Sequence, residues 1–201
     1  MAAKKEAGQR GLLVVISSPS GGGKTTVVKR ILDRGDDRFV YSVSATTRPP
    51  RPGEKDGRDY FFLSEEEFRR RIQEGAFAEW AEVHGHLYGT LKDQIDRNLK
   101  AGKIILLDID VKGGLSLRRA FPEDSLLIFL APPSLDVLEK RLRQRGTDSE
   151  EEISRRLQRV KMELDAAQQY DTVIVNEDLD VTVQAVLEAI DQRLRERSSN
   201  G

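Results

Sequence analysis

The chain contains no cysteine among its 201 residues. This absence excludes disulfides, thiolate metal sites and cysteine nucleophiles, and it agrees with a reducing compartment. Histidine is scarce as well, with 2 residues, His84 and His86. Because they are two positions apart, they would share one face of a strand. No third soft ligand lies nearby, so we favour packing over metal binding for this pair.

The chain also lacks long apolar runs and an excess of charge of either sign. Its first apolar run, residues 12–16, is too short for a signal peptide or for a membrane span of ~20 residues, and we expect a cytoplasmic protein. The 33 basic and 34 acidic residues leave a net charge of −1. Nucleic-acid and membrane binders normally carry a basic excess, so we expect neither partner. Nothing in the sequence indicates an obligate protein partner.

What the chain does contain is a glycine-rich loop at residues 18–26, Ser-Pro-Ser-Gly-Gly-Gly-Lys-Thr-Thr, which directly follows the apolar run. A strand, such a loop and a helix form the layout of a P-loop, in which backbone N–H groups and the helix N-terminus bind phosphates. In this motif Lys24 would reach the β- and γ-phosphates and the Thr25 hydroxyl would bind Mg²⁺. The less favoured alternative is a glycine-rich turn followed by a chance Lys-Thr pair.

One position departs from the pattern G-x-x-x-x-G-K-[ST], because its first place holds Ser18 instead of glycine. The serine costs conformational energy only if this residue must adopt a positive φ. The sequence alone leaves both possibilities open.

The order of apolar and polar segments predicts an α/β fold. We expect strands at 12–17, 39–44, 60–63, 103–109, 126–130 and 172–175, and a hairpin formed by 77–83 and 86–90. We expect helices at 24–34, 65–73, 91–100, from 113 onward, 134–144, 150–168 and 181–195. Ser64 and Glu67 should form a capping box, and Gly113 and Gly114 should open their helix. Strand–helix alternation around a β-rich insert indicates a doubly wound parallel sheet flanked by helices.

Two acids, Asp108 and Asp110, stand at the end of the buried strand at 103–109. Ligands of doubly wound sheets bind beyond the carboxyl ends of the strands. A carboxylate at this place can hold Mg²⁺ directly or through water, as the second half of a nucleotide site. A solvated strand end is the plain alternative.

Cationic and phenolic side chains suited to phosphate gather in two regions. Those of the insert are Arg48, Arg51, Tyr60 and Tyr88. Those of the later helices, which could neutralise a transferring phosphoryl group, are Arg141, Arg145, Arg155 and Arg156. Taken singly, each of them is also compatible with an ordinary charged or packed surface position.

Several stretches are more specific than a P-loop alone. They are residues 42–48 (Ser-Val-Ser-Ala-Thr-Thr-Arg), 57–60, 79–81, 88–90, 107–110, 145–147 and 175–178. Together with the P-loop they resemble the guanylate kinase family from about residue 12 to the last helix. The resemblance implies a kinase that uses ATP and Mg²⁺ to phosphorylate GMP, and also dGMP.

The resemblance also implies a division of the chain. A P-loop NTPase-type core would occupy 11–43 and 93–197, with a helical lid at about 141–160. An inserted α+β lobe at 44–92 would bind the nucleoside monophosphate. Flexible segments are expected at 1–10 and 198–201.

The site residues follow from the same resemblance. ATP would lie on Ser18, Pro19, Ser20, Gly21, Gly22, Gly23, Lys24, Thr25 and Thr26, with Arg141 and Asn176 near its adenine. GMP would bind to Ser44, Arg48, Arg51, Tyr60, Glu79, Tyr88, Thr90 and Asp110. The expected catalytic residues are Lys24, Arg48, Arg145 and Arg156. Mg²⁺ would be held by Thr25 and Asp108, directly or through water.

The residue types expected around the base make chemical sense on their own. Guanine presents two adjacent donors, N1–H and N2–H₂, and the carboxylate of Glu79 can accept from both, whereas adenine presents an acceptor at N1. No general base is needed, because a phosphate monoester with a second pKa of about 6 is already an oxyanion at neutral pH. Two other functions stay open, a peptide-binding guanylate-kinase-like module without activity and a related P-loop kinase acting on a sugar phosphate.

Overall fold

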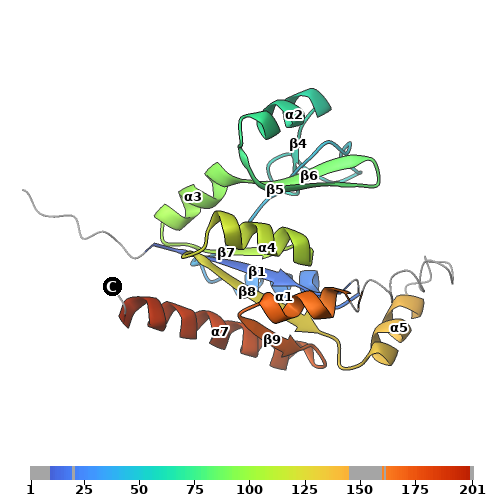
Figure 1. The fold of residues 1–201 in the computed structure, drawn as a ribbon, viewed down its shortest axis with the longest axis vertical. Coiled ribbons are helices and arrows are strands. Elements are labelled where there is room, and N and C mark those ends of the chain that lie inside the picture. Colours follow the sequence, from blue (N-terminus) through green and yellow to red (C-terminus); the bar gives the residue numbers. More distant parts are fainter. Residues whose placement is uncertain (1–9, 20, 145–159, 161, 200–201) are drawn as a thin grey trace, which may run out of the picture.

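The structure, a computed structural model, describes residues 10–19, 21–144, 160 and 162–199 (Figure 1). Five parallel strands form a central sheet in the order β2-β7-β1-β8-β9. In chain order they are β1 (Leu12–Ser17), β2 (Phe39–Tyr41), β7 (Ile104–Asp108), β8 (Ser125–Ala131) and β9 (Thr172–Val175). No helix within the described ranges is long and apolar enough to cross a membrane.

Strand β1 lies in the middle of this sheet and is buried along its whole length. It pairs with β7 on one side and with β8 on the other. A continuous apolar run, without polar alternation, is what a parallel strand covered on both faces requires. The loop at 18–26 therefore leaves β1 at the carboxyl edge of the sheet, where ligands of such folds bind.

Helices cover both faces of the central sheet (Figure 1). Those that flank it are α1 (Lys24–Leu32), α3 (Lys92–Lys100), α4 (Val111–Ala120), η1 (Ala167–Gln169) and α7 (Leu179–Ser199). Helices α1 and α7 pack against one face of β1, and α3, α4 and η1 pack against the other. Successive residues of a strand point to opposite faces, so β1 contributes to both cores. This arrangement confirms the predicted doubly wound parallel sheet.

A second, smaller sheet lies above the central one in Figure 1, in the strand order β4-β3-β6-β5. Its elements are β3 (Ala45–Thr46), β4 (Phe61–Phe62), β5 (Phe77–Val83), β6 (His86–Leu91) and the covering helix α2 (Glu65–Gln73). Phe68 of α2 stacks on Phe77 with ring centroids 4.3 Å apart, at the centre of a separate apolar cluster. The β5–β6 hairpin turns at His84 and Gly85, which both have positive φ as the tight hairpin turns require.

The strand predicted at 39–44 is shorter in the structure, and residues 42–44 connect the two sheets. β2 ends at Tyr41, and β3 begins at Ala45. Between them, Ser42 donates its N–H to the carbonyl of Leu106 at 3.0 Å and its hydroxyl to Oε1 of Gln94 at 3.2 Å. The chain therefore leaves the central sheet beside β7. Periodicity could not locate the end of β2, because β2 and β3 have only three and two residues, too few to show a period.

The prediction about the start of α4 needs correction. Gly113 and Gly114 do not open α4, which begins at Val111 after Asp110, whose side chain accepts from the N–H of Gly113 at 2.8 Å. A Cβ at Gly114 would overlap the hydroxyl of Tyr170, so packing rather than a helix start requires this glycine. At α2, Ser64 caps as predicted.

Only half of the predicted capping box of α2 forms. The N–H of Glu67 donates to Oγ of Ser64 at 3.1 Å, but the Glu67 carboxylate pairs with Arg70 and Arg71. Two guanidinium partners one turn away compete better for the carboxylate than one backbone N–H. Near the chain end, α7 continues through Ser199, so two residues of the expected flexible tail at 198–201 are helical.

The helix predicted at 134–144 is α5 (Leu135–Gln144), and Ser134 accepts from the N–H of Val137 at 3.2 Å as its cap. Residues 160 and 162–166 are helical, in agreement with the predicted helix at 150–168. The rest of the expected lid lies outside the described residues.

Candidate active site

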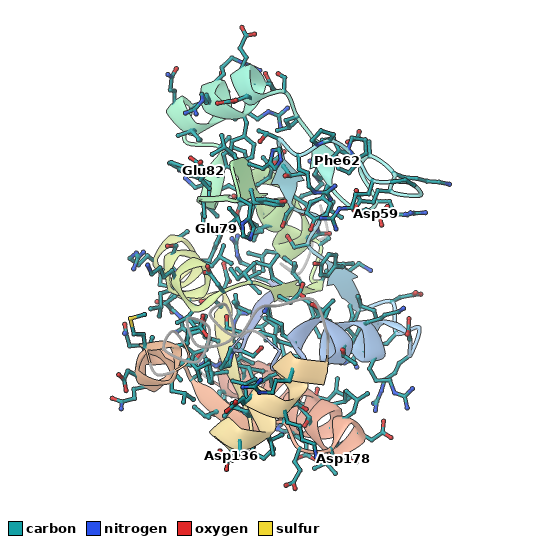
Figure 2. The ribbon with its side chains drawn as sticks, turned by 90° about the vertical axis from the view of Figure 1, so that its right-hand side faces the viewer. Asp59, Phe62, Glu79, Glu82, Asp136 and Asp178 are labelled. Atoms are coloured by element: carbon teal, nitrogen blue, oxygen red, sulfur yellow. The ribbon has the colours of Figure 1, made fainter. Side chains whose placement is uncertain are left out.

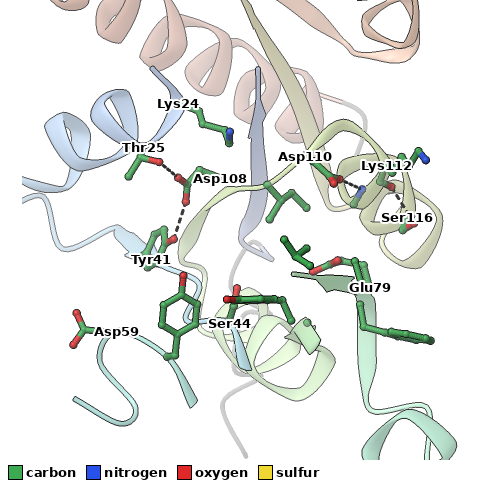
Figure 3. A pocket seen from close by; sticks show the side chains of 18 residues that line it. Lys24, Thr25, Tyr41, Ser44, Asp59, Glu79, Asp108, Asp110, Lys112 and Ser116 are labelled. Atoms are coloured by element: carbon green, nitrogen blue, oxygen red, sulfur yellow. Dashed lines mark hydrogen bonds between the residues drawn. The ribbon is translucent and has the colours of Figure 1, made fainter. Parts of the chain in front are cut away.

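A cleft of about 570 Å³ lies between the central sheet and the small lobe (Figure 3). The carboxyl ends of β2 and β7 and the N-termini of α1 and α4 contribute to it, together with β5 and β6 of the lobe. Of the residues expected to bind nucleotides or metal, those that line it are Lys24, Thr25, Ser44, Tyr60, Glu79, Tyr88, Asp108 and Asp110. The fold thus brings residues from distant parts of the sequence to one cavity.

The glycine-rich loop has the backbone that a phosphate cradle needs. Gly21 and Gly23 have φ of 88° and 87°, values that residues with a Cβ rarely adopt. The loop closes on itself, since the N–H of Gly22 donates to the carbonyl of Pro19 at 2.8 Å. α1 then begins at Lys24, directly after Gly23. Its first N–H groups therefore face the end of the cleft where the triphosphate is expected.

Ser18 stands in the loop without backbone strain. His84 is the one non-glycine residue of the described chain with a positive φ, so Ser18 does not need the conformation that would favour glycine. The side chain is buried, and its hydroxyl donates to the carbonyl of Pro19 at 3.0 Å. The departure from the motif is therefore mild.

Asn176, which follows β9, is hydrogen-bonded to the glycine-rich loop. Its Nδ2 donates to the carbonyl of Gly22 at 2.6 Å, and its Oδ1 accepts from the hydroxyl of Thr182 at 3.0 Å. The residue is 7% exposed, so these bonds form away from water. The resemblance had suggested only a contact with adenine, which stays a prediction. The structural bond to the loop was missed because it joins residues 154 positions apart.

Asp108, the last residue of β7, lies between two hydroxyl groups (Figure 3). Thr25 donates to its Oδ2, and Tyr41 donates to its Oδ1 at 2.7 Å. Hydroxyl and carboxylate oxygens are the hard ligands that Mg²⁺ prefers, so the convergence of Thr25 and Asp108 fits this ion. Tyr41 was not among the predicted site residues. The signal that could have found it is its strand, which ends at the same edge of the sheet as β7.

The packing around its hydroxyl and the nearby charge of Asp108 together raise the pKa of Tyr41, although 41% of the residue surface is exposed. The hydroxyl therefore stays protonated and remains a donor at physiological pH.

Glu79 and Thr90 form the polar pair expected to read the base. They face each other in the β5–β6 ladder, and the Thr90 hydroxyl donates to Oε1 of Glu79 at 2.6 Å. Burial raises the pKa of Glu79, the charge of Asp110 acts in the same direction, and the bond from Thr90 opposes both. In Figure 2, Glu79 lies on the left of the view, on the side of the lobe that faces the core, while Phe62 and Asp59 lie on the right of the lobe.

Arg48 and Arg51 lie next to the cleft but do not line it. The Arg48 guanidinium lies over the ring of Tyr60, 5.3 Å from its centroid, and Tyr60 contacts Tyr88 edge-on at 6.0 Å. Arg51 is exposed. Three of the four residues expected at the phosphate of GMP, Arg48, Tyr60 and Tyr88, are thus neighbours.

Some predicted residues cannot be placed. Ser20, Arg145 and Arg156, together with the side chain of Arg141, lie outside the described residues. Pro19, Gly22 and Thr26 belong to the loop and the first turn of α1. The roles expected of all these residues stay predictions.

Comparison with known proteins identifies the family of the chain. A sequence profile described as guanylate kinase matches residues 10–193. The chain belongs to the guanylate kinase family. Among relatives named guanylate kinase, one from Thermotoga maritima is 46% identical over 181 residues, which are 90% of this chain and 86% of that protein. One from Salinibacter ruber is 49% identical over 183 residues, which are 90% of this chain and 96% of that protein.

Solved structures agree on the fold. The guanylate kinase from Anaplasma phagocytophilum matches with a TM-score of 0.71 and 35% identity, covering 92% of this chain and 86% of that chain. A gluconokinase from Sinorhizobium meliloti matches with a TM-score of 0.53 and 18% identity, covering 96% and 98%. At that identity the second match shows a shared fold only. Membership of the guanylate kinase family therefore comes from the profile and from the closely similar sequences.

Proposed function

We propose that this protein transfers the γ-phosphoryl group of ATP to GMP and produces ADP and GDP. One observation carries the proposal beyond the family: Glu79, which accepts from Thr90, lines the same cleft as the P-loop residues Lys24 and Thr25. A carboxylate that keeps one oxygen available in a half-buried pocket suits the paired donors of guanine and opposes the ring acceptor of adenine. The partners are thus two nucleotides, with ATP as donor and GMP or dGMP as acceptor.

The chain's own groups would align two anions and neutralise their repulsion, which is most of what phosphoryl transfer needs. Lys24 and the N–H groups of the loop would hold the phosphates of ATP. Arg48, Arg51, Tyr60 and Tyr88 would hold the phosphate of GMP. Mg²⁺, held by Thr25 and Asp108 directly or through water, would supply charge neutralisation between the two nucleotides.

We further propose the division of labour that the sequence predicts. Residues 11–43 and 93–197 would form the core, 44–92 the lobe that delivers GMP, and about 141–160 the lid. From the lid, Arg145 and Arg156 would approach the transferred group, and Arg141 and Asn176 would lie near adenine. Lid closure would exclude water, which would otherwise consume ATP without transfer. A reaction of this kind belongs in the cytoplasm, where we expect the protein to act.

The experiment is an acceptor panel of GMP, dGMP, AMP, UMP and dTMP with Mg²⁺ and ATP, in which ADP release is measured. Turnover with GMP and dGMP, and at least ~100-fold less with AMP, is expected from a base site built on polar pairing. Turnover with AMP but not with GMP would falsify the assignment. A Lys24→Ala variant should lose nearly all activity, and retained activity would contradict the P-loop mechanism.

A further inference from the structure

Glu54, for which the resemblance implies no role, holds both arginines that are expected at the phosphate of GMP. Its Oε1 accepts from Nη2 of Arg48 at 2.9 Å, and its Oε2 accepts from the backbone N–H of Arg51 at 2.7 Å. The side chains of Arg48 and Glu54 are 11% and 20% exposed. Both carboxylate oxygens are thus engaged in a partly shielded pair, unlike the mobile ion pairs of an open surface.

The local sequence explains how Glu54 comes to this place. Residues 51–54 are Arg-Pro-Gly-Glu, and the N–H of Glu54 donates to the carbonyl of Arg51 at 3.0 Å. Proline at the second position and Gly53 with a φ of 87° at the third are the marks of a type II turn. The turn folds the chain back, so that the Glu54 side chain reaches the N–H at the first residue of its own turn and Arg48 beyond it.

Arg48 is held on several sides at once. Besides the bond to Glu54, its Nη1 donates to the carbonyl of Pro49 at 2.7 Å. Its guanidinium lies 5.3 Å from the ring centroid of Tyr60 and 5.9 Å from that of Phe62. A guanidinium has five N–H groups in a fixed plane, so these contacts fix its orientation and leave other donors for a ligand. The bond from Arg48 holds the pKa of Glu54 below its usual range, with help from the Arg51 N–H, so Glu54 is a carboxylate at neutral pH.

We propose that Glu54 is a positioning residue for the acceptor, which fixes Arg48 and the turn carrying Arg51 before the phosphate of GMP arrives. This inference rests on the proposed function. A cation that is already oriented loses less conformational freedom when the phosphate binds, so more of the interaction appears as affinity. The opposite interpretation is that Glu54 competes with the phosphate for Arg48, in which case its removal would tighten binding.

The test compares Glu54→Ala and Glu54→Gln with Glu66→Gln, a control at an exposed glutamate of α2 in the same lobe. Calorimetry gives the Kd of GMP and of guanosine, which lacks the phosphate, and steady-state assays give kcat and the KM of GMP and ATP. For Glu54→Ala we expect about tenfold weaker GMP binding and a matching rise in the KM of GMP. The loss of one hydrogen bond to a charged group weakens binding by roughly this factor. The Kd of guanosine, the KM of ATP and kcat should change little.

The Gln variant keeps one acceptor but turns an amide donor toward the N–H of Arg51, so it should lose less affinity for GMP than the Ala variant does. Tighter GMP binding in either variant would show competition and overturn the proposal. So would GMP affinities equal to those of the control, or an equal loss of guanosine binding, which would indicate damage to the lobe. If the unaltered protein itself does not phosphorylate GMP, the proposed function fails separately, whatever the variants do.

Discussion

The hydroxyl of Thr90 donates to Oε1 of Glu79 at 2.6 Å, across the β5–β6 ladder of the small lobe. Thr90 is fully buried, and burial raises the pKa of its carboxylate partner. The bond fixes one carboxylate oxygen and leaves Oε2 near the start of α4, where Gly113 lies. A half-buried, oriented carboxylate that has no cationic partner among the described residues costs folding free energy, which suits a group kept for a ligand rather than for stability.

Replacing Glu79 with Gln should lower kcat/KM for GMP by roughly a hundredfold or more, because the amide presents donors to the donors of guanine. The ratio of GMP to AMP turnover should fall with it. The Thr90 bond survives, since Gln keeps an acceptor oxygen. The acceptor panel measures both effects, and GMP turnover left intact would mean that the base pocket has been misassigned.

The same variant has an expected effect on stability. A raised pKa in the folded state means that the folded protein binds this proton more tightly than the unfolded chain does. Stability contributed at Glu79 is therefore greatest below the ordinary pKa of a glutamate and is lost as the pH rises through the raised value. The Gln variant lacks this loss, so its Tm relative to the unaltered protein should increase with pH. Thermal unfolding across this pH window, with Glu66→Gln as control, measures the difference, and a gap independent of pH contradicts it.

The sequence predicts the parts of the fold that short-range patterns determine. β1 reads as a buried run, and Ser64 and Ser134 read as caps, each from its immediate neighbours. What it could not predict depends on contacts between distant segments. Gly114 is needed because Tyr170 packs against it, and the short span of β2 depends on its pairing with β7, which is more than sixty residues away.

The site shows the same contrast between residues that motifs predict and residues that only long-range contacts reveal. Motifs and family resemblance named Thr25, Asp108 and Glu79, which line one cleft, and Thr90, which donates to Glu79. They did not name Tyr41, Glu54 or the structural bond of Asn176, because each of these acts on another side chain or on the backbone rather than forming part of a motif. Positioning residues of this kind become visible only when the partners' coordinates are known.

Tyr41→Phe removes the hydroxyl that donates to Oδ1 of Asp108 at 2.7 Å and leaves the ring in place. The carboxylate then loses one of the two bonds that orient it toward Thr25. We expect the Mg²⁺ concentration needed for half-maximal ATP binding to rise by about fivefold, the worth of one hydrogen bond. Fluorescence or calorimetric titration of ATP at varied Mg²⁺ checks this. ATP binding in excess EDTA should be unchanged, and a lower Mg²⁺ requirement would mean that Tyr41 restrains Asp108 instead of positioning it.

Asn176→Ala should loosen the glycine-rich loop. It leaves the buried carbonyl of Gly22 without its Nδ2 donor, while the hydroxyl of Thr182 keeps its bond to the carbonyl of Asp178 at 2.6 Å. An unsatisfied buried group costs ~1–3 kcal/mol, so the free energy of unfolding should fall by about this amount and ATP affinity should fall with it. Urea unfolding and ATP titration measure the two effects. Gln184→Ala, at an exposed position of α7, is the control and should change neither.

Gly114→Ala should destabilise the protein through one contact, the hydroxyl of Tyr170, which a Cβ at this position would overlap. The hydroxyl cannot simply move away, because it donates to Oγ of Ser17 at 2.8 Å in a buried site where burial raises its pKa to about 12. Overpacking of this kind costs ~1–3 kcal/mol. In Tyr170→Phe the overlapping oxygen is gone, and the ring carbon that bore it lies 3.2 Å from the added Cβ. Gly114→Ala should therefore cost clearly less in the Phe background, and urea unfolding of the four proteins in this double-mutant cycle measures the coupling. If the two substitutions prove additive, the contact with Tyr170 is not the reason that α4 carries a glycine at this position.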